Sequence, residues 1–180
     1  MALLFVSGSL QRLSANRSLL ATAAQCAKEW AWVSSFEDIA DLPHFNPDLD
    51  GDASEPLRVW REAIARSDGV LIATPEYAHS LPGSLKNALD WIVGSGELYD
   101  KPVALMSAGT SGGQRALDAL TQTLRAQGAH VDSQLSVAGV RPKLDANGDL
   151  ADADTIAHVC ALVSTLVEAA QHSRVAPPTT

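Results

Sequence analysis

The sequence predicts an α/β protein built as a three-layer, doubly wound sheet of five parallel strands. Short apolar runs alternate along the chain with longer amphipathic segments, which is typical of a parallel sheet with helices on both faces. The length of 180 residues gives room for one domain with a substantial core. Right-handed crossovers between such strands lead to the doubly wound arrangement.

Five strands and five helices are expected in alternation. The strand pattern is clearest in the apolar run at 69–74, and the alternation of apolar and polar residues at 131–137 indicates an edge strand. Further strands are expected at 3–6, 32–36 and 103–107, and helices at 14–30, 56–67, 84–93, 114–127 and 155–170. We expect residues 1–172 to form the single domain and residues 173–180 a frayed tail.

The charge balance argues against two broad classes of function. The chain has 13 Lys and Arg against 21 Asp and Glu, a formal net charge of −8. A general nucleic-acid binder or a polybasic membrane-surface protein needs an excess of basic residues instead. No apolar run reaches the length of a membrane span, and the apolar start at 2–6 is too short for a signal peptide. We therefore expect a cytoplasmic protein with no nucleic-acid or membrane partner.

The two cysteines, Cys26 and Cys160, lie far apart in the sequence and form no CxxC pair. A disulfide scaffold or a cysteine-ligated zinc site is therefore not expected. We interpret each cysteine as a small apolar residue on the face of a helix. No metal site is predicted.

Ligands of a doubly wound sheet bind beyond the carboxyl ends of its strands, so the segments that follow the strands carry the functional prediction. Residues 7–17, after the first strand, combine hydroxyls and a glycine with the start of a helix, a setting that binds phosphate. The triphosphate and dinucleotide glycine fingerprints are both absent, so a phosphomonoester fits better. The candidate ligands are Ser9, Gln11, Arg12, Ser14 and Asn16. The alternative is an ordinary capped helix with Ser14 or Asn16 as its N-cap.

Two further segments reach the same edge. Residues 74–87, after the third strand, are stiffened by two prolines and carry Glu76, Tyr77 and His79. Residues 107–113, after the fourth strand, are rich in glycine, which lets the backbone approach a flat ligand closely. Residues 109–113 also match the G-x-S-x-G nucleophile elbow, so a serine hydrolase with a downstream acid and histidine is an alternative.

Taken together, these segments resemble a known family. Three stretches carry the resemblance: Gly8-Ser9-Leu10 with Ser14 and Asn16, then Pro75-Glu76-Tyr77, and then the motif at 80–91 (SLPGSLKNALDW). Together they resemble the NADPH-dependent FMN reductase family. That family has the flavodoxin-like fold, which implies the strand order 2-1-3-4-5 for the predicted sheet, and it includes bacterial chromate and quinone reductases. The likeness runs from residue 3 to roughly residue 140.

The resemblance assigns roles to the candidate residues. It implies that Ser9, Ser14 and Asn16 hold the FMN phosphate, and that Pro75, Glu76 and Tyr77 line the ribityl chain and the isoalloxazine. The segment 107–113 would border the ring, with Ser107, Gly109, Thr110 and Gly112 as its candidate contacts.

Two residues depart from the family pattern. Gln11 stands where an arginine is common, which leaves Arg12 or Arg17 as the candidate cation. Ala78 stands where an asparagine usually follows the tyrosine.

The predicted function is that of an NAD(P)H-dependent, FMN-containing oxidoreductase that passes hydride through flavin to a quinone, free flavin or a similar small acceptor. The cofactors carry this chemistry, so no catalytic side chain is predicted. A flavin-binding electron carrier without NADPH activity is the alternative within flavoproteins. The resemblance also implies a homodimer or homotetramer. Trp60 and Trp91 are candidate interface residues because large aromatics are enriched at interfaces, and the alternative, favoured for either residue alone, is that they pack on the sheet.

Overall fold

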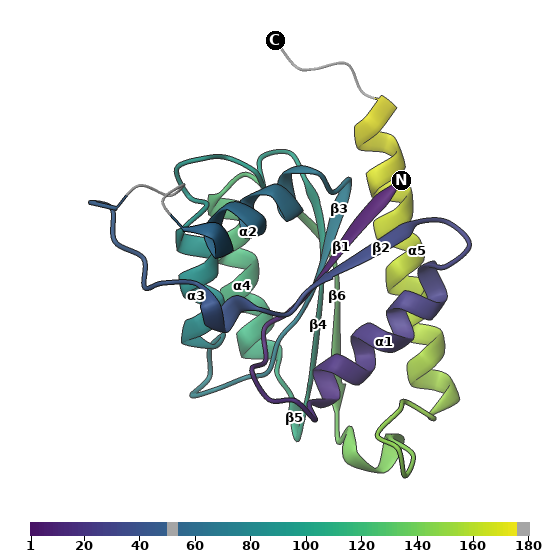
Figure 1. The fold of residues 1–180 in the computed structure, drawn as a ribbon. Coiled ribbons are helices and arrows are strands. Elements are labelled where there is room, and N and C mark those ends of the chain that lie inside the picture. The colour runs from purple at the N-terminus through teal and green to yellow at the C-terminus, as the bar shows by residue number, and fades with distance from the viewer. Residues whose placement is uncertain (50–53, 176–180) are drawn as a thin grey trace.

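The computed structural model describes residues 1–49 and 54–175. Its centre is a six-stranded sheet in the order β2-β1-β3-β4-β6-β5, in which only the last pair is antiparallel (Figure 1). The strands are β1 (Ala2–Ser7), β2 (Trp32–Phe36), β3 (Gly69–Ala73), β4 (Pro102–Gly109), β5 (Ser111–Gly112) and β6 (His130–Ala138).

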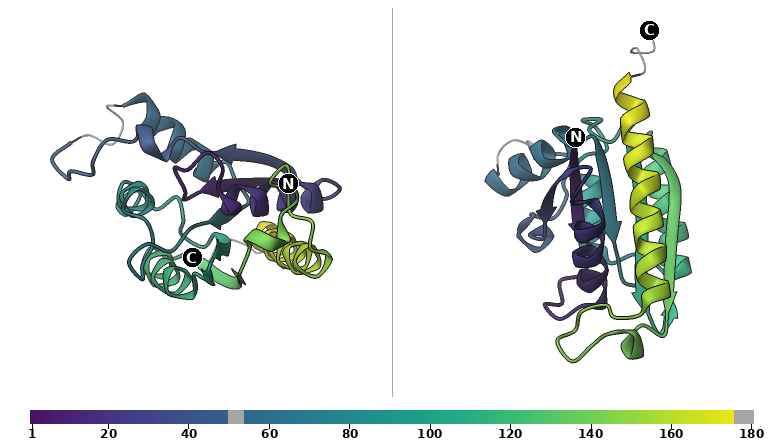
Figure 2. Two further views of the ribbon diagram at one scale, coloured as in Figure 1. Left: turned by 90° about the horizontal axis from the view of Figure 1, so that it is seen from below. Right: turned by 90° about the vertical axis from the view of Figure 1, so that its right-hand side faces the viewer.

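Helices cover both faces of the sheet, which gives three layers (Figures 1 and 2). One face carries α1 (Ala15–Ala27) and α5 (Ala153–Val175), and the other carries α2 (Glu55–Ala65), α3 (Gly83–Asp90) and α4 (Gln114–Ala126). Two short 3-10 helices, Ile39–Asp41 and Arg141–Lys143, lie in the connections. The five long strands all run parallel, so their carboxyl ends lie at one edge of the sheet, toward the bottom of Figure 1.

The period of two along the central strands explains why both faces are covered. In β1, Leu4 and Val6 face a core shared with α2, α3 and α4, while Leu3 and Phe5 face a second core shared with α1 and α5. All five residues of β3 are buried. Strands that are apolar on both sides exclude water only when helices pack on each side.

The predicted three-layer, doubly wound architecture is confirmed, and the five long strands lie in the predicted order. The sequence analysis missed β5, because two residues are too short to give a periodic signal. The last helix begins close to its predicted start and continues to Val175, three residues into the segment expected to be frayed. The remainder of that segment, residues 176–180, lies outside the described residues.

Helix α5 is long and apolar enough, by length and composition, to cross a membrane. Its apolar stripe packs against the sheet, where Val159, Val163 and Leu166 are buried in the core shared with α1. The high hydropathy of this helix is therefore explained by its place in the core.

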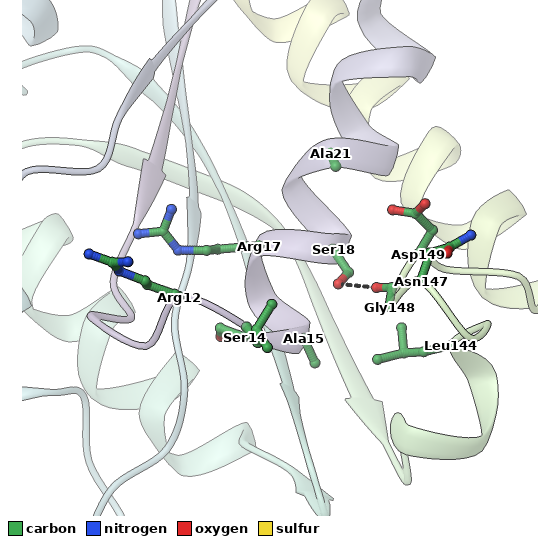
Figure 3. A pocket seen from close by; sticks show the side chains of 11 residues that line it. Arg12, Ser14, Ala15, Arg17, Ser18, Ala21, Leu144, Asn147, Gly148 and Asp149 are labelled. Atoms are coloured by element: carbon green, nitrogen blue, oxygen red, sulfur yellow. Dashed lines mark hydrogen bonds between the residues drawn. The ribbon is translucent and has the colours of Figure 1, made fainter.

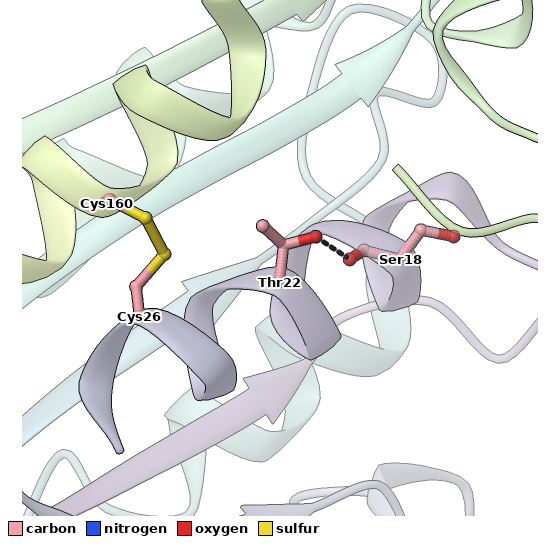
Figure 4. The surroundings of a disulfide bond; sticks show 4 residues. All are labelled: Ser18, Thr22, Cys26 and Cys160. Carbon is pink, nitrogen blue, oxygen red and sulfur yellow. Dashed lines mark hydrogen bonds between the residues drawn. A yellow bond between two sulfur atoms is a disulfide. The ribbon is translucent and has the colours of Figure 1, made fainter. Parts of the chain in front are cut away.

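The interpretation of the two cysteines was wrong. Cys26 of α1 and Cys160 of α5 form a disulfide, with their Cα atoms 5.2 Å apart (Figure 4). They lie on helices as expected, but α1 and α5 pack side by side on the same face of the sheet, which sequence distance does not reveal. Helix packing therefore brings together two thiols that are 134 residues apart in the chain.

Trp60 and Trp91 pack in the core, so the alternative expected for each of them is confirmed and the suggestion that they form an interface was wrong. Trp60 is 1% exposed and donates its indole N–H to the carbonyl of Ala88 at 2.8 Å. Trp91 is 7% exposed and donates to the carbonyl of Pro43 at 2.8 Å. Both rings fill the core between the sheet and its helices and are not available to a partner.

The disulfide should stabilise the fold because it closes a loop of 134 residues in the unfolded chain. Reduction, or the double variant Cys26→Ala/Cys160→Ala, should lower the free energy of unfolding by about 2–4 kcal/mol. Urea unfolding with and without reductant measures this difference. The double variant is the control, because its midpoint must not respond to reductant. A wild-type midpoint that is equally insensitive would contradict the prediction.

Candidate functional site

A cavity of about 570 Å³ opens at the carboxyl edge of the sheet. Segments that follow β1, β3, β4 and β6 form its walls, and this is the edge at which doubly wound sheets bind ligands. Its volume lies in the range of small-molecule sites. The lining residues are Ser9, Gln11, Leu13, Ser14, Ala15, Asn16, Pro75, Glu76, Tyr77, Ala108, Gly109, Thr110, Ser111, Gly113, Gly139, Val140, Arg141, Pro142 and Leu144.

The start of α1 forms the anion-binding end of the cavity. Ser14 is the N-cap of this helix, and its hydroxyl oxygen accepts a hydrogen bond from the N–H of Asn16 at 3.3 Å. The hydroxyl oxygen of Ser9 accepts one from the N–H of Gln11 at 3.3 Å. Both serines are buried beneath the loop, and the first turn of α1 carries no acidic residue. The two interpretations of this segment, a phosphate site and an ordinary capped helix, are therefore compatible, since a capped helix start also binds anions.

Asn16 clamps this loop to the sheet. Its amide oxygen accepts a hydrogen bond from the N–H of Ala108 at 2.8 Å, and its amide nitrogen donates to the carbonyl of Ala108 at 3.2 Å. Asn16 is 2% exposed, and both ends of its side-chain amide are occupied. Its side chain therefore fixes where the loop lies relative to the end of β4.

The two candidate cations near this loop do not line the main cavity but a second pocket, which Figure 3 shows. Arg12 and Arg17 line a second pocket of about 260 Å³ between the start of α1 and residues 144–149. Arg17 is also paired with Glu37. On the far side of α1, the hydroxyl of Ser18 donates to the carbonyl of Gly148 at 2.6 Å (Figure 3).

The segment after β3 ends in a tight two-residue turn. Tyr77 and Ser80 exchange two backbone hydrogen bonds of 3.0 Å, and between them Ala78 and His79 have positive φ angles of 50° and 64°. Two consecutive left-handed residues are the signature of a type I′ turn, in which asparagine and glycine are favoured. The turn leaves Tyr77 on the cavity wall, where it is 55% exposed. Ala78 and His79 do not line the cavity.

Glu76 joins two of the walls. Its carboxylate accepts a hydrogen bond from the N–H of Arg115 at the start of α4 at 3.1 Å and lies 3.3 Å from Nδ1 of His79. A carboxylate at a helix N-terminus is stabilised by the free N–H groups and the helix dipole. Glu76 therefore fixes the segment after β3 to the segment that follows β4.

The segment after β4 requires its glycines. Gly113 has a φ of +81°, and a Cβ there would lie 2.0 Å from the hydroxyl oxygen of Ser107. Gly112 has a φ of +89°, and a Cβ there would lie 2.3 Å from Oγ of Ser136. Ser107 lies beneath the lining, and its buried hydroxyl has no hydrogen-bond partner among the described residues. Gly109 and Thr110 line the cavity, whereas Gly112 does not.

The sequence analysis missed the fourth wall, which residues 139–144 form after β6. The N–H of Gly139 donates to the carbonyl of Thr110 at 3.2 Å, which ties this wall to the third. The ammonium of Lys143 donates to the hydroxyl of Thr155 at 2.8 Å and lies 3.3 Å from the carboxylate of Asp152. Hydrogen bonds from the hydroxyl and N–H of Thr155 lower the pKa of the Asp152 carboxyl. Gly139 and Pro142, which follow the expected edge strand closely, were the available signal.

The nucleophile elbow is not supported by the geometry. Ser111 lines the cavity within the G-x-S-x-G segment, but no histidine lines it in the part of the chain that the structure describes. A serine nucleophile needs a base within hydrogen-bond reach, so this site lacks the arrangement for acyl transfer.

A capped helix start after β1 beside a glycine-rich, backbone-lined cavity is the architecture of flavodoxin-like proteins. This chain belongs to the NADPH-dependent FMN reductase family, whose sequence model matches residues 1–140.

Relatives that are named as quinone reductases agree with this assignment. The chain is 36% identical over 159 residues to the 2-hydroxy-1,4-benzoquinone reductase of a Burkholderia species, covering 83% of this chain and 85% of the relative. It is 32% identical over 177 residues to the quinone reductase of Escherichia coli K12, covering 93% and 94%. The solved structure of the flavoenzyme NAD(P)H:(acceptor) oxidoreductase FerB from Paracoccus denitrificans has a TM-score of 0.86 at 29% identity, covering 96% and 98%.

The cavity fits the FMN that this family uses. The hydroxyls of Ser9 and Ser14 and the start of α1 suit a phosphomonoester at one end. At the other end, the backbone of 108–113 and the segment 75–77 enclose the cavity, and Gly113 lets this backbone lie directly on Ser107, where a Cβ would clash. The orphaned hydroxyl of Ser107 directly beneath this end is a further polar group near a flat ligand.

The left-handed turn at Ala78 gives a stability prediction. A non-glycine residue at positive φ is strained, and asparagine tolerates this region better than alanine. Ala78→Asn should raise the free energy of unfolding by about 0.5–1 kcal/mol, since it suits the first central position of a type I′ turn. Ala78→Val should lower it, because a β-branched side chain fits that conformation worse. Chemical denaturation of both variants measures the effect, and the reverse order of stabilities would refute the strain argument.

Proposed function

We propose that this protein takes hydride from NADPH onto bound FMN and passes the electrons to a quinone. The family is that of NADPH-dependent FMN reductases, and the chain is a flavin-dependent oxidoreductase on that ground. The proposed route from NADPH through FMN to a quinone rests on one observation: the same cavity has an anion-binding helix start at one end and a glycine-lined backbone wall at the other.

Bound FMN supplies the chemistry, because its ring accepts hydride and donates electrons. The protein binds and orients it. In this proposal Ser9, Ser14 and the N–H groups at the start of α1 hold the phosphate, while Asn16 keeps that loop against β4. Pro75, Glu76 and Tyr77 form one side of the ring site.

The remaining predicted residues act around these contacts. Gly109 and Thr110 border the ring, and Gly112 and Ser107 support that border from behind. Gln11 lines the phosphate end, Arg12 adds positive charge from the neighbouring pocket, and Ala78 holds the turn that presents Tyr77.

A quinone is the proposed acceptor because the relatives named above include a 2-hydroxy-1,4-benzoquinone reductase and a quinone reductase. The test is NADPH oxidation by the FMN-loaded protein with 1,4-benzoquinone as acceptor. We expect turnover, with a higher kcat/KM for NADPH than for NADH. A yellow protein that oxidises neither coenzyme would instead be an electron carrier, and a preference for NADH would overturn the coenzyme assignment.

The phosphate site gives a separate binding prediction. Riboflavin lacks the phosphate, so it should bind about ten- to a hundredfold more weakly than FMN, as expected for the loss of a hydrogen bond to a charged group. Titration of the apoprotein with each flavin, followed by flavin fluorescence, measures the ratio. Equal dissociation constants for riboflavin and FMN would contradict the proposal that the start of α1 binds the phosphate.

We also propose that the protein is a cytoplasmic homodimer or homotetramer. Trp60 and Trp91 are buried in the core, so the supporting surface is a different one. Leu13 and Tyr77 line the cavity and are 91% and 55% exposed, and Leu10 in the same loop as Leu13 is 52% exposed. Exposed apolar side chains beside a ligand site favour association. Light scattering of the FMN-loaded protein measures the mass, and a value of 18.9 kDa would refute the oligomer.

A further inference from the structure

Arg141 is the single cationic residue that lines the main cavity in the part of the chain that the structure describes. It begins the short 3-10 helix after β6 and is exposed. Its guanidinium makes no ion pair and no side-chain hydrogen bond with any described residue. Arg17 and Arg58, by contrast, are each paired with a glutamate, whereas among the described residues Arg12 and Arg115 resemble Arg141 in this respect but do not line the main cavity.

The backbone that carries Arg141 is held firmly. Gly139 is bonded to Thr110, and two residues beyond Arg141 the ammonium of Lys143 reaches the start of α5, where it contacts Asp152 and Thr155. Pro142 follows directly and restricts the chain further. A charge on a fixed backbone at the wall of a cavity biases which ligands enter it.

The negative charge of Glu76 in the cavity does not neutralise the positive charge of Arg141. Glu76 is the single carboxylate among the lining residues of the described chain. Its oxygens are engaged by the N–H of Arg115 and lie beside His79, and it makes no ion pair with Arg141. The cavity therefore carries one committed negative charge and one uncommitted positive charge.

We propose that Arg141 makes this site selective for electron acceptors that carry a negative charge, such as quinones with an ionised ring substituent. This inference rests on the proposed function and deepens it by naming the acceptor class. Arg141 acts as a specificity residue that attracts the anionic substituent while the quinone ring lies in the cavity. The overall charge of −8 would repel such acceptors from the rest of the surface, so a local cation has the larger effect on them.

The reduced coenzyme is the competing ligand for this charge. The 2′-phosphate of NADPH lies at the adenosine end of the molecule, far from the nicotinamide that must reach the ring site. The segment that carries Arg141 is hydrogen-bonded through Gly139 to Thr110, which borders the proposed ring site, so Arg141 is better placed for a small acceptor at the ring than for that distant phosphate. The FMN phosphate is the other competitor, and it has its own site at the start of α1.

The test compares 1,4-naphthoquinone with 1,4-naphthoquinone-2-sulfonate as acceptors for the FMN-loaded protein. The ratio of kcat/KM for the anionic to the neutral quinone should fall about three- to fivefold in Arg141→Gln, the range expected for an exposed charge pair. It should fall about tenfold in Arg141→Glu and be largely retained in Arg141→Lys. The wild-type ratio should also fall as salt is raised. Lys28→Gln, which removes an exposed positive charge at the end of α1, is the matched control and should leave the ratio unchanged.

A binding measurement makes the test independent of turnover. Titration of the oxidised, FMN-loaded protein with naphthalene-2-sulfonate and with its neutral sulfonamide, followed by flavin absorbance, should show the same loss of anion preference in Arg141→Gln. If the wild type reduces no quinone, the proposed function fails, while this titration still decides the role of Arg141.

Three results would overturn the inference. Unchanged ratios in all Arg141 variants would make it an ordinary surface arginine. A loss confined to kcat/KM for NADPH would assign it to the coenzyme, and a weaker dissociation constant for FMN with unchanged acceptor ratios would assign it to the cofactor.

Discussion

Two buried hydrogen bonds between the side chain of Asn16 and the backbone of Ala108 hold the candidate site together. They join the first turn of α1 to the end of β4 across 92 residues of sequence. A side-chain amide that pairs with both the N–H and the C=O of one residue fixes distance and orientation at once. Without this contact the helix start after β1 and the glycine segment after β4 would be independent loops, and one ligand could not rely on both. The hydrogen bond from the N–H of Arg115 to the carboxylate of Glu76 joins the segment after β3 to the start of α4 in the same way.

Because these contacts hold the backbone, the site can present mostly backbone and small side chains to its ligand. Gly113 lies so close to Ser107 that no side chain fits there, and Ser9 and Ser14 contribute only hydroxyls. Such a lining suits a cofactor that performs its own chemistry, since the protein then needs to bind, orient and exclude rather than to donate a nucleophile or a metal. The left-handed residues at 78 and 79 fit the same logic, because strain in the backbone is tolerated where it places a wall of the site.

The sequence predicted those parts of the molecule whose signals are local. Apolar runs such as 69–74 marked the central strands, and their order followed from the resemblance to a flavodoxin-like family. Three of the four cavity walls followed from the rule that ligands bind beyond the strands. The parts that failed depend on contacts between distant residues. Nothing near Asn16 indicates that its amide is used by Ala108, and nothing near Trp60 indicates that its indole reaches Ala88. The wall at 139–144 was missed because it follows an edge strand and carries no phosphate-binding pattern.

The disulfide is the clearest case of such a distant contact, and its place in the fold relates it to the site. Helix α1 is tied to the α5 side of the molecule at two points: by Cys26 and Cys160 toward its carboxyl end, and by the hydroxyl of Ser18 on the carbonyl of Gly148 near its start. Between them Leu19 and Ala23 are fully buried against the sheet. A helix whose start is to bind an anion must not rotate about its own axis, because the N–H groups of its first turn would then point away from the ligand. The two ties and the buried stripe between them remove that freedom, so the orientation of the phosphate-binding end is set by packing on the opposite side of the same helix.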